Sequence, residues 1–212
     1  MKIGVLGSGD VGKVLAKGFV KHGHEVMLAT REPARLAQWG RENPKVRIGS
    51  LPDTARFAQL AVLAVKGTAA VAAAREAGAG NLEAKVVIDA TNPIAEAPPS
   101  NGVLKFFTNL DRSLMEQLQE EFPRVRFVKA FNSVGNARMV NPEFAGARPT
   151  MFICGNDAPA KETVRGLLDQ FGWETEDMGM AESARAIEPL GMLWCIRGFL
   201  HNQWGHAFKL LK

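Results

Sequence analysis

The chain lacks several residue types on which common enzyme sites are built. It has no tyrosine, two cysteines and four histidines among 212 residues. Without tyrosine there is no Tyr-x-x-x-Lys acid of the kind that short-chain dehydrogenases use. No H-x-x-x-H spacing or cysteine pair indicates zinc, so we predict no metal site. No G-x-S-x-G sequence indicates the nucleophile of an α/β-hydrolase.

Other absences bear on where the protein works and what it binds. Cys154 and Cys195 lie in apolar stretches, which is typical of reduced core residues, so we expect a cytoplasmic protein. No run of about 18 apolar residues could form a membrane helix, and we expect no membrane partner. The first strand pattern starts at residue 2, so we expect no signal peptide. The net charge of +4, without basic runs carrying aromatic residues, argues against a nucleic-acid partner.

The most informative feature that is present is the stretch 2–12, where an apolar strand pattern runs into G-x-G-x-x-G. Gly7 would permit a tight turn, Gly9 would let the backbone approach a pyrophosphate, and Gly12 would let the next helix pack on the strand. A helical pattern follows at once, so the N–H groups of its first turn would face the phosphates. The stretch therefore predicts a dinucleotide site.

The end of the second predicted strand, residues 25–29, indicates which dinucleotide. A site that prefers NAD usually carries Asp or Glu there, roughly 20 residues past the glycines. This chain has Thr30 and Arg31 instead, with Arg35 one helical turn later. A guanidinium can hold a 2′-phosphate with two charge-assisted hydrogen bonds, so the pattern predicts NADP(H). The alternative is that both arginines belong to a solvated helix start, since Pro33 is typical of a first turn.

Strand and helix patterns alternate along the chain, which predicts an α/β Rossmann fold with a doubly wound parallel sheet and a small C-terminal α/β extension. We place an NADP-binding domain at residues 1–135 and the extension, with a dimer or substrate-pocket helix, at residues 136–212. The further predicted strands are residues 46–49, 59–65, 85–90, 125–131, 150–155 and 174–177. The predicted helices are residues 34–41, 52–57, 69–77, 113–122, 158–171 and most of 182–212.

The last predicted helix combines an apolar stripe with glycines spaced seven residues apart. The stripe consists of Leu193, Ile196, Leu200, Trp204, Phe208 and Leu211. Glycine costs a helix about 1 kcal/mol relative to alanine, so Gly191, Gly198 and Gly205 suggest close approach of another helix or a flat ring. Three interpretations stay open: packing on the chain's own sheet, a subunit interface, or the floor of a substrate pocket.

Ligands of a doubly wound sheet bind beyond the carboxyl ends of its strands. The strand ends at Lys66-Gly67 and Asn92-Pro93 should flank the nicotinamide ribose. Lys66 either pairs with a phosphate or is a solvated lysine. Asn132 either holds the carboxamide or a ribose hydroxyl, or caps a helix that begins near Asn136.

No residue stands out as a general acid. His22 and His24 precede the second strand, at the edge of the sheet where active sites do not form, and His201 and His206 fall in the last predicted helix. The catalytic residues therefore stay unassigned. This favours hydride transfer to a flavin or deazaflavin, because the protein then mainly positions two rings face to face.

Together these motifs resemble the NADP-dependent oxidoreductases of coenzyme F-420 (F420), the 8-hydroxy-5-deazaflavin carrier. The resemblance covers most of the chain and runs through residues 7–12, 30–31, 128–133, 153–157, 177–179, 184–190 and 202–206. The middle and the tail are also similar to the reductase domain of six-transmembrane ferric reductases, which pass hydride from NADPH to a flavin.

The resemblance implies a homodimer with a deazaflavin pocket between the strand-end loops and the C-terminal helix. It assigns the pyrophosphate to the glycine motif, the 2′-phosphate to the Thr30 region, and the nicotinamide to residues 64–66 and 132–137. The predicted cofactor-binding residues are Gly7, Ser8, Gly9, Asp10, Val11, Gly12, Thr30, Arg31, Arg35, Ala64, Val65, Lys66, Asn92, Asn132, Val134 and Ala137.

The chain departs from the deazaflavin enzymes near the acceptor. It lacks their Pro-Trp pair near Lys66 and their histidine near Asn132, and residues 91–93 look closer to the ferric reductases. We therefore expect hydride transfer between NADP(H) and F420 or a free flavin, FMN or FAD. One alternative is a reductase of a small ketone or imine, with Lys66 or Asn132 as the acid. The other is a non-catalytic NADP(H) sensor that binds a partner protein through the last helix.

Overall fold

In the computed structural model, which describes residues 1–212, a six-stranded parallel sheet has the order β3-β2-β1-β4-β5-β6. This is the strand order of a Rossmann sheet, so the predicted fold class is confirmed. The strands are β1 (Lys2–Leu6), β2 (Glu25–Ala29), β3 (Val46–Gly49), β4 (Leu60–Leu63), β5 (Val86–Asp89) and β6 (Arg126–Lys129).

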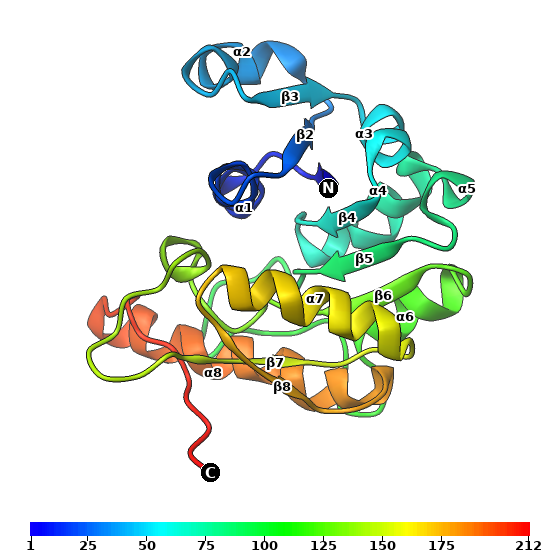
Figure 1. Cartoon of the computed structure of the whole chain (residues 1–212). Coiled ribbons are helices and arrows are strands. Elements are labelled where there is room, and N and C mark those ends of the chain that lie inside the picture. Colours follow the sequence, from blue (N-terminus) through cyan, green and yellow to red (C-terminus); the bar gives the residue numbers. More distant parts are fainter.

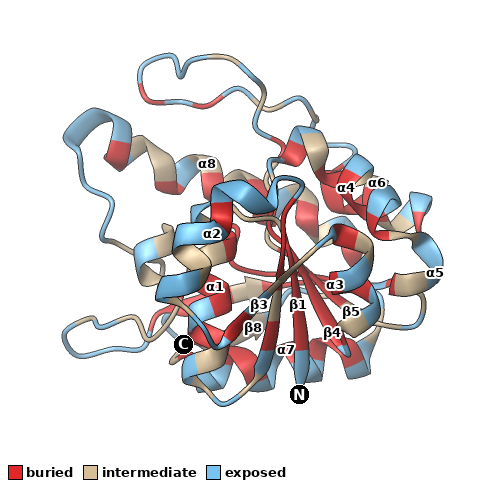
Figure 2. Ribbon diagram, turned by 90° about the horizontal axis from the view of Figure 1, so that it is seen from above, coloured by how far each residue is buried: buried red, intermediate tan, exposed pale blue.

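Helices cover both faces of the sheet, with α1 on one side and α3, α4 and α6 on the other (Figure 2). Ile3 and Val5 of β1 belong to one buried cluster and Leu6 to the other, as alternation along a strand requires. Burial on both faces explains the continuously apolar strands. The helices are α1 (Asp10–Lys21), α2 (Pro33–Glu42), α3 (Leu51–Phe57), α4 (Ala70–Ala77), α5 (Ala79–Leu82) and α6 (Leu114–Glu121), with a 3-10 turn η1 (Gly67–Ala69).

The C-terminal part packs beside β6 (Figure 1). It contains η2 (Asn136–Arg138), β7 (Thr150–Ile153), α7 (Ala158–Gln170), β8 (Glu174–Asp177), η3 (Ala181–Ser183) and α8 (Ala184–His201), and β7 pairs with β8 in parallel. Met151 and Val164 belong to the same buried cluster as Val5 and Phe19, so this part shares a core with the sheet. The domain boundary at residue 135 stays a prediction.

The predicted helix over most of residues 182–212 is wrong beyond His201. Asn202 adopts a left-handed conformation, with φ 52° and ψ 35°, and ends α8. The tail then runs back to β7, where the N–H of Thr150 donates to the carbonyl oxygen of Phe208 at 2.9 Å. Residues 203–212, which include Gly205 and His206, are therefore not helical.

The apolar stripe predicted for this helix is not one continuous face, because only Leu193, Ile196 and Leu200 lie in α8, while Trp204, Phe208 and Leu211 lie in the non-helical tail. The buried residues of α8 are Ala184, Ile187, Glu188, Gly191, Trp194 and Gly198. Leu193 and Leu200, by contrast, are 53% and 52% exposed. A Cβ on Gly198 would lie 2.2 Å from the indole of Trp204, so the flat ring that approaches this glycine belongs to the chain's own tail.

Candidate functional site

The turn between β1 and α1 has the geometry that the glycine motif predicts. Gly7 has φ +124°, and a Cβ there would lie 2.3 Å from the carbonyl oxygen of Ala64, so only glycine fits. A Cβ on Gly12 would lie 1.9 Å from the carbonyl oxygen of Gly7, which shows how closely α1 packs on the turn. Gly9 has no atom within 4 Å of its ideal Cβ, so the space beside it is open to a ligand. An open approach at the second glycine fits a pyrophosphate.

The first turn of α1 presents main-chain donors to the same space. Gly9 is its N-cap residue, and no side chain caps the helix. The first N–H groups of a helix have no partner within it, so those of Asp10, Val11 and Gly12 can serve an anion. None of these three residues lines the cavity described next, so their part in binding the cofactor stays a prediction.

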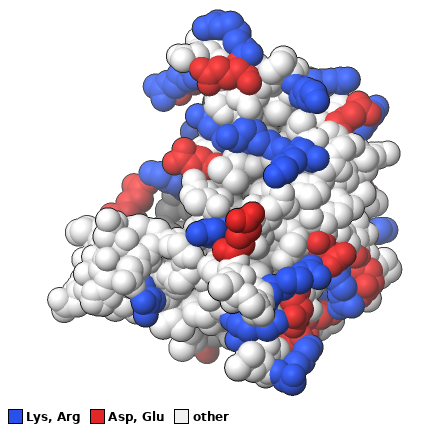
Figure 3. Space-filling model, turned by 60° about the vertical axis from the view of Figure 1, so that its left-hand side comes forward, with Lys and Arg blue, Asp and Glu red and all other residues white.

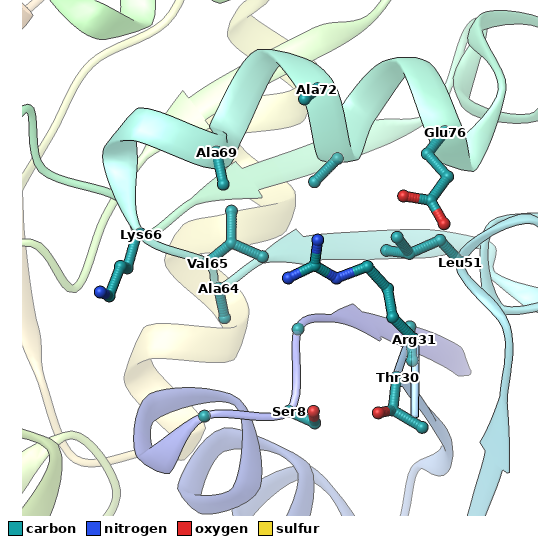
Figure 4. A pocket seen from close by; sticks show the side chains of 14 residues that line it. Ser8, Thr30, Arg31, Leu51, Ala64, Val65, Lys66, Ala69, Ala72 and Glu76 are labelled. Atoms are coloured by element: carbon teal, nitrogen blue, oxygen red, sulfur yellow. The ribbon is translucent and has the colours of Figure 1, made fainter. Parts of the chain in front are cut away.

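A first cavity of about 350 Å³ lies beyond the carboxyl ends of β1, β2 and β4 (Figure 4). Its lining includes these predicted residues: Gly7, Ser8, Gly9, Thr30, Arg31, Ala64, Val65 and Lys66. The predictions missed Ala29, Leu51, Ala69, Ala72, Ala73 and Glu76, which complete the wall. Four of these six, Ala69, Ala72, Ala73 and Glu76, lie on one face of η1 and α4, directly after a strand end, and their helical spacing was the signal available in the sequence.

Arg31 and Arg35 occupy different environments. Figure 4 shows the guanidinium of Arg31 inside the first cavity, between Thr30 and the wall formed by α4. Arg31 takes part in none of the ion pairs of the structure, so its charge is available to a ligand. Arg35 lies outside the cavity, pairs with Glu32 at 2.6 Å and is 79% exposed in its side chain. Arg35 therefore fits the alternative of a solvated helix start.

Glu76 brings a carboxylate to the far wall of the first cavity, where Figure 4 shows it beside Leu51 and facing the Arg31 side. Thr30 is nearly buried, and its hydroxyl accepts a hydrogen bond from the N–H of Glu32 at 3.1 Å. Thr30 thus shapes the turn that carries Arg31 into the cavity.

A second cavity of about 590 Å³ adjoins the first, between η1 and the loop after β5. Val65 and Lys66 line both cavities, so Lys66 stands between them. A Cβ on Gly67 would lie 1.9 Å from the carbonyl oxygen of Asn92, which brings the two strand ends into contact. The other lining residues are Gly67, Thr68, Ala90, Thr91, Asn92, Ile94, Ala95, Glu96 and Ala97.

Asn92 and Asn132 meet at the carboxyl ends of β5 and β6. Nδ2 of Asn92 donates to the carbonyl oxygen of Asn132 at 2.7 Å, and Nδ2 of Asn132 donates to the carbonyl oxygen of Ile187 at 2.8 Å. Asn132 does not cap a helix near Asn136, because Gly135 is the N-cap residue of η2 and no side chain caps it. That alternative is wrong.

The remaining predicted cofactor residues do not reach either cavity. Asn132 and Val134 are buried, and Ala137 is exposed on η2. None of the three lines the first or the second cavity, so their roles toward the cofactor stay predictions.

The cysteines and histidines lie away from both cavities. Burial raises the pKa of the Cys154 thiol to about 12, so this group is a poor nucleophile. Both cysteines are free thiols. No group of three or more His, Cys, Asp or Glu side chains could hold a metal ion, and no helix has both the length and the apolar character to cross a membrane.

One part of the surface is poor in charge. Figure 3 shows a largely uncharged lobe at the lower left of that view. Leu193, Phe199 and Leu200 of α8 are 53%, 44% and 52% exposed. Exposed apolar residues gathered on one helix mark a candidate interaction surface.

Known proteins share both the sequence and the structure of this chain. The family model described as NADP oxidoreductase coenzyme F420-dependent matches residues 2–93. The metalloreductase STEAP3 of Rattus norvegicus is 31% identical over 202 residues, which are 91% of this chain and 37% of that protein. The metalloreductase STEAP2 of Homo sapiens is 27% identical over 203 residues, and the chain again spans 37% of its length.

Among solved structures, the chain is similar to a protein from Arthrobacter sp. FB24 named as an F420-dependent NADP reductase. The two are 35% identical, each chain is covered completely, and the TM-score is 0.93. An imine reductase of Streptomyces aurantiacus has a TM-score of 0.66 at 14% identity, covering 91% of this chain and 61% of its own, so it shares the fold alone. The chain therefore belongs to the coenzyme F420-dependent NADP oxidoreductase family.

Proposed function

We propose that the protein transfers a hydride between NADP(H) and a flavin-type acceptor, which is F420 or a free flavin such as FMN or FAD. The observation that carries this proposal is the pair of adjoining cavities, which share Val65 and Lys66 and have no histidine or cysteine in their walls. The chain has no tyrosine at all. The first cavity then holds the adenosine half of the cofactor, the nicotinamide lies between Lys66 and Asn92 where the two cavities meet, and the rest of the second cavity holds the acceptor ring.

The first cavity binds the adenosine half of the cofactor. Arg31 and Thr30 hold the 2′-phosphate, which explains a guanidinium where sites for NAD carry a carboxylate. The open backbone at Gly9 and the first-turn amides of α1 hold the pyrophosphate. Ala64, Val65 and Lys66 lead from there to the second cavity. Bound NADPH supplies the hydride from C4 of its nicotinamide ring.

The second cavity binds the acceptor. Its volume of about 590 Å³ falls within the range of small-molecule sites, roughly 300 to 1,000 Å³. Lys66 and Glu96 are its only titratable lining residues. A flavin-type ring needs little acid chemistry from the protein, so this sparse lining suits it better than a ketone, which needs a positioned proton donor.

We further propose that the protein is a cytoplasmic homodimer. Two free cysteines are typical of a reducing compartment. The exposed apolar side of α8 supports a subunit interface, since closed two-fold dimers are the commonest assemblies of soluble proteins.

The test is oxidation of NADPH in the presence of F420, FMN, FAD or buffer alone, with each reaction repeated with NADH. We expect rapid oxidation of NADPH with one flavin-type acceptor and slower oxidation of NADH. If NADPH binds but none of the flavins is reduced, the proposal fails. A parallel set of assays with small ketones and imines then tests the reductase alternative. If none of these compounds is reduced, the remaining alternative is a non-catalytic sensor.

A further inference from the structure

Three ionisable side chains are buried next to Thr91, which lines the second cavity. Lys129 and Asp89 are fully buried, and the side chain of Glu188 is 2% exposed. Nζ of Lys129 lies 2.6 Å from Oδ2 of Asp89 and 2.9 Å from Oε1 of Glu188, and it donates to the carbonyl oxygen of Thr91 at 3.0 Å. We call these three side chains the Lys129 network. Burying an ion costs several kcal/mol, so such a cluster persists only with close partners of opposite charge.

The Lys129 network connects four elements that are distant in the sequence. Asp89 ends β5, Lys129 ends β6, and Glu188 lies in α8. The two carboxylate oxygens of Glu188 accept hydrogen bonds from the N–H groups of Leu114 and Met115, both at 3.0 Å. These groups open α6, and the start of a helix carries partial positive charge. They therefore offset the surplus negative charge of two carboxylates facing one ammonium.

The network holds Thr91 through both of its main-chain polar groups. Oδ1 of Asp89 accepts from the N–H of Thr91 at 2.9 Å and from its hydroxyl at 2.6 Å. The carbonyl oxygen of the same residue accepts from Lys129. Thr91 and the following Asn92 line the second cavity. The network therefore fixes the position of the main chain in that part of the wall.

Helix α8 packs against Asn92 and Asn132, the residues that follow β5 and β6. A Cβ on Gly191 would lie 2.7 Å from the carbonyl oxygen of Asn132 and 2.8 Å from Nδ2 of Asn92. Nδ2 of Asn132 also donates to the carbonyl oxygen of Ile187. Between Lys129 and Asn132, Phe131 has φ +65°, a conformation that is costly for a bulky residue and persists only where its surroundings enforce it.

Lys129 does not act as a proton donor. Burial lowers the pKa of Lys129, but the charges of Asp89 and Glu188 outweigh that effect and raise it, so the group stays an ammonium. It is sealed from solvent and lines neither cavity. Any effect of Lys129 on a reaction therefore acts through Thr91, Asn92 and α8.

We propose that Lys129, together with Asp89 and Glu188, is a positioning residue for the acceptor end of the site. The network holds the loop after β5 and helix α8 in the one arrangement in which the second cavity meets the first beside Lys66. This inference rests on the proposed function, because it assigns the network to the acceptor and not to the binding of NADP(H).

The test compares Glu188→Gln with Asp177→Asn. The first removes one charge of the network at constant size. The second weakens the Lys161–Asp177 ion pair of 2.9 Å, which joins α7 to β8 and lines neither cavity. The measurements are backbone amide exchange of residues 90–97 without ligand, the dissociation constant for NADPH, the fluorescence of bound NADPH, and the single-turnover rate of NADPH oxidation with the acceptor identified above.

For Glu188→Gln we expect amide exchange of residues 90–97 to rise and the single-turnover rate to fall by about ten-fold or more, because small misplacements of reacting groups cost this much. The dissociation constant for NADPH should stay unchanged. Asp177→Asn should lower the unfolding temperature but leave these measurements as they are in the wild type. Equal effects of the two variants, or a wild-type exchange pattern and rate in Glu188→Gln, would overturn the proposal.

Two further outcomes, a wild type that reduces no flavin and a variant that does not fold, still leave the role of the network testable. If the wild type reduces no flavin, the proposed function fails, while amide exchange and the fluorescence of bound NADPH still decide whether the network orders this wall. If Glu188→Gln does not fold, the variant Lys129→Met/Asp89→Asn/Glu188→Gln removes all three charges and leaves no buried ion unpaired. A folded triple variant with wild-type exchange and fluorescence would overturn the inference, and loosened residues 90–97 would support it.

Discussion

We propose that the preference for NADP(H) depends on Arg31. Its guanidinium is unpaired and lies inside the first cavity. Hydrogen bonds to a charged group contribute about 1.5–3 kcal/mol, which corresponds to roughly 10- to 100-fold in affinity. Arg31→Ala should therefore raise the dissociation constant for NADPH by that factor and leave the one for NADH unchanged, as measured by fluorescence titration.

Arg35→Ala is the matched control, because Arg35 pairs with Glu32 outside the cavity. We expect it to weaken NADPH binding much less than Arg31→Ala. Equal losses for NADPH and NADH in Arg31→Ala would show that the 2′-phosphate is held elsewhere.

Substitutions at Gly9 and Gly12 distinguish a glycine that leaves room for a ligand from a glycine that is needed for packing. Gly9 has φ −70° and ψ −175°, which alanine adopts freely, and a Cβ there meets no atom within 4 Å. Gly9→Ala should leave the unfolding temperature unchanged but abolish measurable NADPH binding, because the methyl group occupies the space of the pyrophosphate. Gly12→Ala should destabilise the fold itself, since its Cβ would lie 1.9 Å from a carbonyl oxygen. Normal NADPH binding by Gly9→Ala would contradict this assignment.

At the scale of elements, Gly198 decides how the tail packs on α8. In an exposed helix interior, replacing glycine by alanine stabilises by up to about 1 kcal/mol. Gly198→Ala should do the opposite, because the new methyl group would clash with the indole of Trp204 and displace residues 202–212. We expect a lower unfolding temperature and faster proteolysis of the tail.

Gly166→Ala is the control for this effect. Gly166 lies on the exposed side of α7, with no atom within 4 Å of its ideal Cβ. It should stabilise the protein or leave it unchanged. Stabilisation by both substitutions would mean that Trp204 does not rest on α8 in solution.

The start of α6 carries a pH-dependent contribution to stability. Hydrogen bonds from Arg185 lower the pKa of Glu116 to about 2, below its ordinary value of 4.5. Because the folded state binds the proton more weakly than the unfolded state, the stabilisation is complete well above pH 4.5 and is lost as the pH falls toward 2.

Glu116→Gln should therefore lower the free energy of unfolding in urea at neutral pH, and the difference from the wild type should shrink as the pH falls through this range. Glu162→Gln removes a pair whose side chains are both well exposed, so we expect little change at any pH. A difference for Glu116→Gln that is constant with pH would refute the assignment.

At the scale of the whole molecule, the exposed apolar residues of α8 predict that two copies associate through this helix. A charge at the centre of such an interface would be buried without a partner. Leu193→Glu should convert the dimer to a monomer in analytical ultracentrifugation without lowering the unfolding temperature of the monomer. Leu211→Glu, at an 84% exposed position of the tail, should leave the assembly intact. A wild-type protein that sediments as a monomer would remove the basis of this prediction.

Much of the first cavity follows from local sequence patterns. A few neighbouring residues are enough to recognise the motif at Gly7–Gly12 and the strand end at Thr30–Arg31, because turn geometry and strand length depend on neighbours along the chain. The same patterns do not reveal Leu51 or Glu76, which reach the cavity from other elements. They also do not distinguish Arg31 from Arg35, since pairing with Glu32 is a property of the folded turn.

The sequence by itself determined the Rossmann sheet, the glycine turn and the absence of tyrosine chemistry, because alternating apolar patterns and turn glycines act over short distances along the chain. Only the tertiary structure decided where α8 ends and what its glycines contact, since Phe208 of the tail pairs with Thr150 of β7, which lies 58 residues earlier. It also decided that residues 89, 129 and 188 form one buried ionic network. Contacts between residues so far apart follow from the packing of whole elements, which no local pattern encodes.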